Sequence, residues 1–416
     1  MDLAEVDVIV LGAGIVGVTT ALNLRQHGAS VALIDRGHPG DETSGANAGI
    51  VAGNGLCPIA LPSGAAVWLD ILLKQSTAYT VALSTLVRLA PWIRAYLQNS
   101  GPEGIQRFVR VMAPLRAAAR AEHQRLGRLA NAQRFYRNSG WLQLHRSEAS
   151  LMRAERERHY ARIYGIDYQT LRGGEMHEVE PAVRSDRFFG VYWPDCDSVS
   201  NPAGLTEGLW REFIQGGGLF LNGDANRLER RRSRWVLPTP RTEVRGREVV
   251  AALGPWTPAF ARARGDLFPV AFGRGYAQHF RPGSGVTLKR PVTDMDHGFT
   301  LTPMERGIRL TSGVEVADPA DPINSQVLHR ARKRAQDVFP LGQDLPVPPV
   351  MGTREALPDS LPVVGASATQ RGLWYNFGHG GHGLALGPVC SRQLADLMAG
   401  NDPAVSANAL TPLRFA

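Results

Sequence analysis

Cysteine and lysine are scarce in this chain of 416 residues. Its three cysteines, Cys57, Cys196 and Cys390, lie far apart and form neither a CxxC motif nor a Cys/His ligand spacing. A disulfide framework or a structural zinc site is therefore not expected, and a reducing compartment is the default. Lysine occurs only three times, so arginine carries nearly all of the positive charge behind the formal net charge of +8.

Long apolar runs are also missing. The first apolar run follows acidic residues, among them Asp2 and Asp7, where a signal peptide would have basic ones. A glycine-rich turn interrupts that run well before the ~20 apolar residues that a membrane-spanning helix needs. These features predict a cytoplasmic protein, and they leave peripheral contact with the inner face of a membrane open.

The densest cluster of charge is the arginine run within "NRLERRRSRWVL", residues 226–237. A nucleic-acid or anionic-membrane patch is one interpretation of such a run. A solvated hairpin edge, where charges block pairing with another sheet, is the interpretation that we favour, because only one face of one hairpin is involved. No nucleic-acid partner is expected. The rest of the composition, with 44% hydrophobic and 20% charged residues, is ordinary for a globular protein.

The stretch "VIVLGAGIVGVTTALNLRQHGASVALIDR", residues 8–36, has the order strand, glycine-rich turn, helix and strand. Gly12 permits a tight turn, Gly14 lets the backbone approach a pyrophosphate, and Gly17 allows the helix to pack closely on the strand. Asp35 ends the second strand, where a carboxylate can accept hydrogen bonds from ribose hydroxyls. This context predicts a bound adenosine diphosphate moiety, and the motif alone does not choose between NAD and FAD. The expected contacts are Gly12, Gly14, Ile15, Val16, Gly17, Asp35 and Arg36.

Similar pieces recur later in the chain. Helical periodicity covers residues 83–97, with Pro91 starting a fresh helix, and residues 105–129. A further helix is expected at 202–215, antiparallel strands between about 270 and 316, and a strand, a turn and a helix at 373–398. Rossmann-like units at the start, middle and end of the chain predict two intertwined domains.

The loop "ETSGANAG", residues 42–49, has two interpretations. Its small and amide side chains can hold a cofactor through backbone N–H groups and short donors. Glycine, serine and asparagine also dominate ordinary surface turns. The residues alone leave both possibilities open.

Four blocks in a fixed order carry a resemblance to a known family. They are "VIVLGAGIVG…LID", "ETSGANAG", "VVAALGPWT" and "REALPDSLPVVG…GHGGHGLALGP". The chain resembles the D-amino-acid oxidase-type family of FAD-dependent oxidoreductases, especially its D-amino-acid dehydrogenase (small-subunit-like) branch. The resemblance spans almost the whole length. It implies FAD in the opening motif, and it implies further FAD contacts from Ser44, Asn47, Ala48, Gly49, Gly254, Trp256, Gly378, His379, Gly380, Gly381, His382, Gly383 and Leu384.

The fold that the resemblance implies is α/β. A Rossmann-like FAD-binding domain is expected from residues 1–56, 195–265 and 350–416. It is interleaved with an α+β substrate domain, built on an antiparallel-rich sheet, from residues 57–194 and 266–349.

The resemblance also implies a reaction. Hydride passes from the α carbon of a D-amino acid to flavin N5, and the resulting imine is hydrolysed to a 2-oxo acid. The variant "LPDSLPVVG" also resembles enzymes acting on hydroxy-D-proline, so a cyclic substrate is included. Oxygen or a quinone-linked chain accepts the electrons. The sequence does not determine which amino acid is oxidised. It also does not determine the oligomeric state of the protein.

The substrate carboxylate needs a cation, and the forked guanidinium of arginine matches it. Arg354 corresponds to the arginine of the family's G-x-R-P block, although Glu355 replaces the proline here. The alternative for Arg354 is an ion pair with Glu355 or Asp359. Arg309 and Tyr276 are further catalytic candidates. For each of them a purely structural role is the alternative.

The turn "GHGGHG", residues 378–383, raises the question of a metal. His379 and His382 have no acid or thiolate nearby, so we expect no metal site. By resemblance the turn borders the flavin, and His382 is also a catalytic candidate. Leu384 stands where relatives often have threonine. No cysteine lies between Cys196 and Cys390 to attach a flavin covalently, so FAD is expected to be non-covalent.

Two alternative functions remain at this point. One keeps the fold and oxidises N-methylated glycine derivatives, in the manner of sarcosine and glycine oxidases. The other is a tRNA-modifying flavoprotein, which the positive charge would suit. No methyltransferase-like domain or RNA-binding module accompanies the chain to support it.

Overall fold

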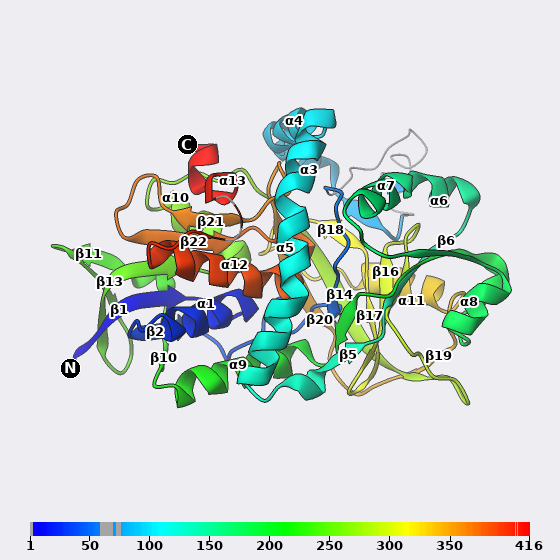
Figure 1. Cartoon of the computed structure of the whole chain (residues 1–416), viewed down its shortest axis with the longest axis horizontal. Helices are drawn as coiled ribbons and strands as arrows, with labels where there is room; N and C mark the ends of the chain where they lie inside the picture. Colours follow the sequence, from blue (N-terminus) through cyan, green and yellow to red (C-terminus); the bar gives the residue numbers. More distant parts are fainter. Residues whose placement is uncertain (1–2, 59–69, 72–75, 404, 406) are drawn as a thin grey trace.

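The computed structural model describes residues 3–58, 70–71, 76–403, 405 and 407–416. Within these residues the strands form two large sheets and one small one. Figure 1 shows the two large sheets side by side, with the long helix α5 (Pro102–Leu129) crossing in front of them and both chain ends on the side of the first sheet.

The first sheet has eight strands among the described residues, and its centre is parallel. β1 pairs in parallel with β2 and β13, β2 pairs in parallel with β10, and β13 pairs in parallel with β22. The carboxyl ends of these strands therefore meet at one edge. The strands are β1 (Leu3–Leu11), β2 (Val31–Asp35), β10 (Leu219–Asn222), β11 (Glu229–Arg231), β12 (Arg234–Pro238), β13 (Glu243–Ala251), β21 (Val363–Ala366) and β22 (Leu373–Phe377).

The apolar runs form the centre of that sheet. Val8 to Leu11 of β1 are all buried, as expected for a strand covered on both faces. The arginine run folds as the antiparallel hairpin of β11 and β12, which confirms the hairpin prediction.

The second sheet has eleven strands among the described residues and is mainly antiparallel. Its centre is β14, which pairs with β17, β18, β19 and β20. The strands are β4 (Tyr79–Val81), β6 (Trp141–His145), β7 (Gln169–Arg172), β8 (Phe189–Trp193), β14 (Ala271–Pro282), β15 (Val292–Asp294), β16 (Phe299–Met304), β17 (Gly307–Thr311), β18 (Val314–Val316), β19 (Leu341–Asp344) and β20 (Val350–Ala356). A small third sheet contains β3 (Ile50–Val51), β5 (Tyr136–Asn138) and β9 (Asp197–Val199).

The α/β class and the antiparallel-rich second sheet agree with the expectation. The division of the chain into domains stays a prediction. β20, residues 350–356, falls in a range predicted for the FAD-binding domain, whereas its strand partner is β14 of the second sheet.

The helices expected at 83–97, 105–129, 202–215 and before residue 398 are present, and the structure adds shorter helices that the sequence did not predict. α3 and α4 meet at position 89–90 with Pro91 in the first turn of α4, and Asn201 caps α9 by accepting a hydrogen bond from the Gly204 N–H. The α-helices are α1 (Ile15–Gln26), α3 (Leu83–Arg88), α4 (Ala90–Asn99), α5, α6 (Glu148–Arg153), α7 (Glu155–Ile163), α8 (Gly174–Val179), α9 (Pro202–Gln215), α10 (Thr257–Arg262), α11 (Ser325–Ala335), α12 (Gly383–Met398) and α13 (Ala407–Leu410).

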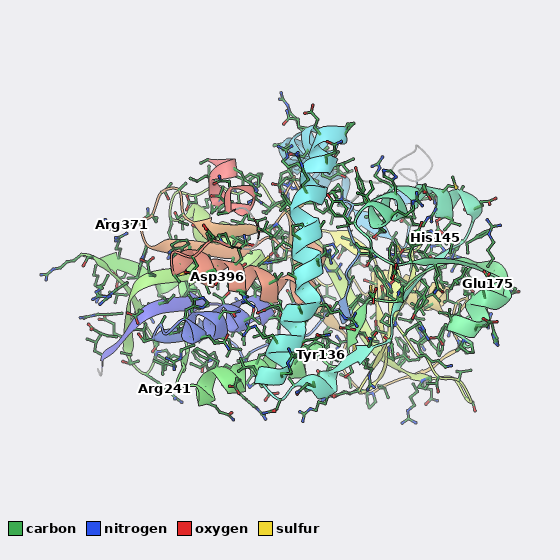
Figure 2. The ribbon with its side chains drawn as sticks, viewed as in Figure 1. Tyr136, His145, Glu175, Arg241, Arg371 and Asp396 are labelled. Atoms are coloured by element: carbon green, nitrogen blue, oxygen red, sulfur yellow. The ribbon has the colours of Figure 1, made fainter. Side chains whose placement is uncertain are left out.

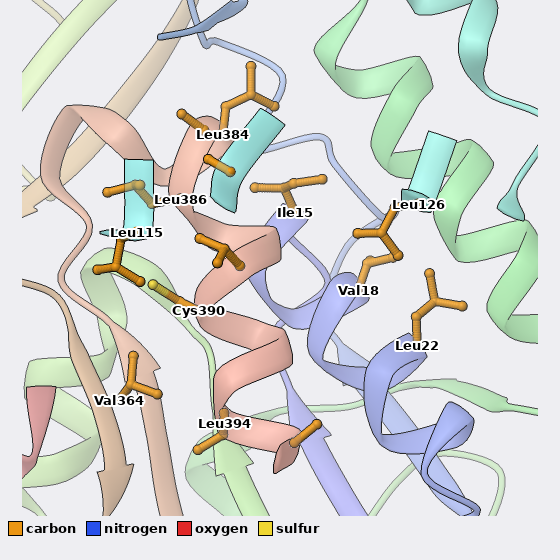
Figure 3. Close-up of a cluster of buried hydrophobic side chains, with 14 of the residues drawn as sticks. Ile15, Val18, Leu22, Leu115, Leu126, Val364, Leu384, Leu386, Cys390 and Leu394 are labelled. Atoms are coloured by element: carbon orange, nitrogen blue, oxygen red, sulfur yellow. The ribbon is translucent and has the colours of Figure 1, made fainter. Parts of the chain in front are cut away.

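One hydrophobic cluster joins α1, α5, α9, α12 and α13 to the first sheet. Figure 3 shows Ile15 and Val18 of α1 beside Leu384 and Leu386 of α12. α5 adds Leu115, Leu126 and neighbouring apolar residues to the same cluster. α1 is buried around nearly its whole circumference, which explains its weak amphipathic pattern. Along the described parts of the chain, no helix combines the length and the apolarity needed to cross a membrane.

Candidate active site

A large cavity opens at the carboxyl edge of the first sheet, where α/β sheets commonly bind ligands. It encloses about 1330 Å³ of space free of protein atoms, part of which is open to solvent. Its walls come from both large sheets. They include Gly12, Gly14, Ile15, Val16, Asp35, Arg36, Ser44, Asn47, Gly254, Trp256, Gly352, Arg354, Glu355, Asn376, Phe377, His379, Gly380, Gly381, Gly383 and Leu384.

The three glycines of the opening motif have different roles. Gly12 has φ +99°, and a Cβ there would lie 2.4 Å from the Ala252 carbonyl oxygen. A Cβ at Gly17 would lie 1.8 Å from the Gly12 carbonyl oxygen. At Gly14 a Cβ would meet only the Ser44 Oγ, at 3.2 Å. Gly12 and Gly17 are therefore required for backbone packing, whereas Gly14 keeps the cavity open.

The N-terminus of α1 points at this opening. Its N-cap residue is Gly14, which has no side chain of its own to cap the helix. The Ile15 N–H donates to the Ser44 Oγ at 2.9 Å, which ties the helix to the loop 42–49. A helix N-terminus offers further N–H groups and a partial positive charge, the features that bind a diphosphate.

Asp35 lies at the end of β2 and lines the cavity. Its Oδ2 accepts from the Ala13 N–H at 2.6 Å, and its Oδ1 accepts from the Gly37 N–H at 2.9 Å. Beside it the Arg36 guanidinium carbon lies 4.6 Å from the Trp256 ring centroid. Asp35 thus shapes the glycine turn while its carboxylate faces the cavity.

The loop 42–49 contributes to the cavity through residues between Glu42 and Asn47. Ser44 and Asn47 line it, whereas Ala48 and Gly49 do not. The Ala48 carbonyl accepts from Thr302 Oγ1 at 2.8 Å, and a Cβ at Gly49 would lie 2.5 Å from the Val199 carbonyl oxygen. Ala48 and Gly49 therefore fasten the loop to neighbouring strands.

The turn before α12 borders the other end of the cavity. Its lining includes five of the predicted FAD contacts, which are His379, Gly380, Gly381, Gly383 and Leu384. Three other predicted contacts, Gly17, Gly378 and His382, lie outside the lining. His382 lines a small adjoining cavity together with Cys57, Ser360 and Phe108. Burial lowers the pKa of His379 to about 4 and that of His382 well below its usual value, so both rings are neutral near pH 7.

Arg354 points into the cavity from β20. A Cβ on Gly275 would lie 3.0 Å from its Nη2, and a Cβ on Gly381 would lie 4.0 Å from its Cδ, so two glycines make room for the side chain. Burial lowers its pKa. Asp359 pairs with Arg414, and Glu355 accepts from the Gly378 N–H. Among the described residues, no carboxylate lies within ion-pair distance of Arg354.

The other two carboxylate candidates have partners elsewhere. Arg309 Nη1 donates to the carbonyls of Gly45 and Asn47, at 2.8 and 2.7 Å, and so holds the loop 42–49 on β17. The Tyr276 hydroxyl donates to Glu315 Oε2 at 2.5 Å in a buried network. Neither side chain belongs to the cavity lining, so their catalytic roles stay predictions that this geometry does not favour.

Several lining residues escaped the sequence reasoning. Residues 223–226 follow β10, whose Asn222 is opposite Asp35 of β2, and they form part of the wall. A polar turn after a strand at the carboxyl edge was the available signal. Asn376 and Phe377 gave no comparable signal, because they read as an ordinary buried strand.

Glu355 is the least expected member of the lining, because its carboxyl group is buried and no ion pair joins it to a cation of the described residues. Burial raises its pKa from 4.5 to about 7, against the opposing effect of the Gly378 N–H, which donates to Oε1 at 2.9 Å. A raised pKa means that the folded protein holds this proton more tightly than the unfolded chain does. The stabilising contribution is therefore complete below pH 4.5 and is lost as the pH rises to about 7.

We predict that Glu355→Gln removes this dependence of folding stability on pH. The neutral amide imitates the protonated acid, so the variant should be more stable than the wild type at pH 8, by up to about 3 kcal/mol, and similar at pH 4.5. Thermal or urea unfolding across this pH range measures the difference. Glu178→Gln, at an exposed position, is the control. Parallel stability curves for Glu355→Gln and the wild type would contradict the prediction.

The cavity fits the dinucleotide that the resemblance implies. Because Gly14 has no side chain, the part of the cavity beside the α1 N-terminus stays open, and Asp35 lines the cavity next to it. Two buried polar atoms of lining residues, His379 Nε2 and Asn376 Oδ1, have no hydrogen-bond partner among the described residues. Unpaired buried polar atoms are costly and are usual where a polar ligand completes them. In the described part of the chain, no group of three or more metal-ligating side chains gathers to hold an ion.

Comparisons with known proteins agree with this geometry. The profile of the family described as "FAD dependent oxidoreductase" matches residues 7–397. The chain is 25% identical to a D-amino-acid oxidase of Bradyrhizobium diazoefficiens, over 98% of each chain. It is 30% identical to a D-amino acid dehydrogenase of Methylobacterium sp., over 96% of each. The solved structure of glycine oxidase from Geobacillus kaustophilus superposes with a TM-score of 0.76 at 21% identity, covering 99% of this chain and 100% of that one.

Proposed function

The chain belongs to the FAD dependent oxidoreductase family, and we propose that it uses FAD to oxidise the α carbon of a D-amino acid. The imine so formed is hydrolysed to a 2-oxo acid. Relatives named D-amino-acid oxidase and D-amino acid dehydrogenase match over nearly the whole chain. The observation that carries the substrate class is Arg354, a guanidinium that lines the cavity and has no carboxylate partner in the described chain.

FAD, when bound, accepts the hydride that leaves the substrate. The α1 N-terminus and Gly14 would hold its diphosphate, and Asp35 would face its ribose. The turn 380–384, which opens α12, would supply N–H groups to the flavin end. These assignments are proposals that rest on which groups line the cavity.

Arg354 orients the substrate. Its guanidinium matches a carboxylate with two parallel N–H donors, and this fixes the direction of the α carbon. The side chain is partly buried, so water screens the interaction less than it would at the surface. Phe377 and Leu384 keep that end of the cavity apolar, and His379 stays neutral beside them.

A panel of substrates tests this function. Purified protein is mixed without oxygen with D-, L-, cyclic and N-methyl amino acids, and the loss of visible flavin absorbance is followed. D-amino acids should reduce the flavin, and their L-enantiomers should not. Reduction by glycine and sarcosine alone would favour the N-methyl alternative. Admitting air afterwards separates the two proposed acceptors, because rapid reoxidation requires that oxygen be one.

We predict that the cofactor is non-covalent. The purified protein should be yellow, and heat or acid denaturation should release FAD into the supernatant. All three cysteines are free thiols in the structure, and burial raises the pKa of each to about 12, which leaves them unreactive. Flavin that remains with the precipitated chain would contradict the prediction. A colourless protein that FAD cannot reconstitute would overturn the cofactor assignment as well.

A further inference from the structure

The first turn of α12 lacks a hydrogen bond of its own helix. α12 contains Pro388, whose nitrogen carries no hydrogen. In an α-helix the N–H of residue 388 would donate to the carbonyl of residue 384. The Leu384 carbonyl therefore has no donor at that position. Leu384 is 2% exposed and lines the cavity, so leaving its carbonyl unpaired would be costly.

A histidine from another helix supplies the donor. His123 of α5 has its Nε2 2.9 Å from the Leu384 carbonyl oxygen. Since a carbonyl oxygen only accepts, Nε2 carries the hydrogen. Nδ1 then accepts from the Tyr136 hydroxyl at 3.0 Å, and Figure 2 labels Tyr136 beside the C-terminal end of α5. Burial lowers the pKa of His123 to about 4, so the ring is neutral and has a single N–H near pH 7.

The surrounding packing makes this contact a fixed one. α5 and α12 share the hydrophobic cluster of Figure 3, in which Leu384 and Cys390 belong to α12 and Leu115 and Leu126 to α5. His123 is 1% exposed, and its ring meets that of Tyr136 edge-on, with centroids 5.6 Å apart. The ring therefore has little freedom to turn away from the Leu384 carbonyl.

We propose that His123 is a positioning residue for the cofactor: it donates to the Leu384 carbonyl in place of Pro388 and so holds the cavity-lining turn of α12. Gly383 in this turn, and Gly380 and Gly381 just before it, have no side chains to keep the backbone from approaching FAD. His123 itself is outside the cavity lining and acts through that backbone. This inference rests on the family's cofactor and does not depend on which substrate is oxidised.

A double-mutant cycle on the holoenzyme tests the proposal. His123→Leu removes the donor and keeps apolar bulk, and it should raise the dissociation constant for FAD about tenfold. Pro388→Ala restores a backbone N–H at residue 388. In that background the same His123→Leu change should raise the FAD dissociation constant less than about threefold, because the two donors are interchangeable. The midpoint potential of the bound flavin should shift in His123→Leu. It should return to the wild-type value when His123→Leu is combined with Pro388→Ala.

Two further variants separate donation from packing. His123→Gln can donate from its side-chain amide, and it should bind FAD nearly as the wild type does. Tyr136→Phe removes only the hydroxyl that Nδ1 accepts from, and it controls for that second contact. An equal loss of FAD affinity in the wild-type and Pro388→Ala backgrounds would overturn the proposal, as would unchanged affinity in His123→Leu. Should His123→Leu fail to fold, weak FAD binding by His123→Gln would overturn it. None of these measurements uses a substrate, so failure here is distinct from failure of the proposed reaction.

Discussion

Replacing Arg354 with alanine should leave the FAD content unchanged and remove most of the turnover. The guanidinium lines the cavity beside the α12 turn, where Gly275 and Gly381 leave room for its side chain. Loss of a buried partner for a carboxylate costs about 3–5 kcal/mol, which is on the order of a hundred- to several-thousandfold in kcat/KM. Steady-state kinetics with the best D-amino acid of the panel measures the loss.

Arg354→Lys and Arg309→Ala are the matched comparisons. Lysine should rescue poorly, because its single ammonium cannot form the two parallel hydrogen bonds of a guanidinium. Arg309→Ala should instead lower the FAD content, since Arg309 holds the loop of Ser44 and Asn47 through the Gly45 and Asn47 carbonyls. An Arg354 variant that melts earlier but turns over normally where folded would assign Arg354 to the structure and not to the substrate.

Gly14→Val should yield a folded protein without FAD. A Cβ at Gly14 meets only the Ser44 Oγ, at 3.2 Å, and the residue does not have a positive φ, so a small shift of the Ser44 hydroxyl is enough for the Cβ to fit. The added side chain would instead occupy the space beside the α1 N-terminus where the diphosphate is expected. Visible absorbance and FAD titration of the purified variant measure the effect, and circular dichroism checks the fold.

Two neighbouring positions make this prediction specific. Gly17→Ala should destabilise the protein itself, because its Cβ would overlap the Gly12 backbone. Asp35→Asn should only weaken FAD binding, by about ten- to a hundredfold, which is the usual effect of losing a charged acceptor. A Gly14→Val protein with full FAD content would show that the cofactor lies elsewhere.

Local sequence determined much of the fold. The periodicity of residues 105–129 predicted α5, and Pro91 marked the break between α3 and α4, because apolar spacing and proline act within a few residues of chain. The opening motif predicted β1, α1 and β2 with the glycine turn between them for the same reason. Structure that depends on such short-range interactions can be predicted directly from the sequence.

Other features depended on which distant segments meet. Arg309 and Arg354 look alike as strand arginines, yet one has carbonyl partners from the loop 42–49 and the other faces the cavity. The hydrogen bond between His123 and the Leu384 carbonyl joins residues 261 positions apart. The sequence by itself determined the strands, the helices and the glycine turn that suits a diphosphate, because these follow from neighbouring residues. Only the tertiary structure decided which cations are free, which carboxyl group is buried and what holds the α12 turn, because burial and hydrogen bonding are set by partners from other parts of the chain.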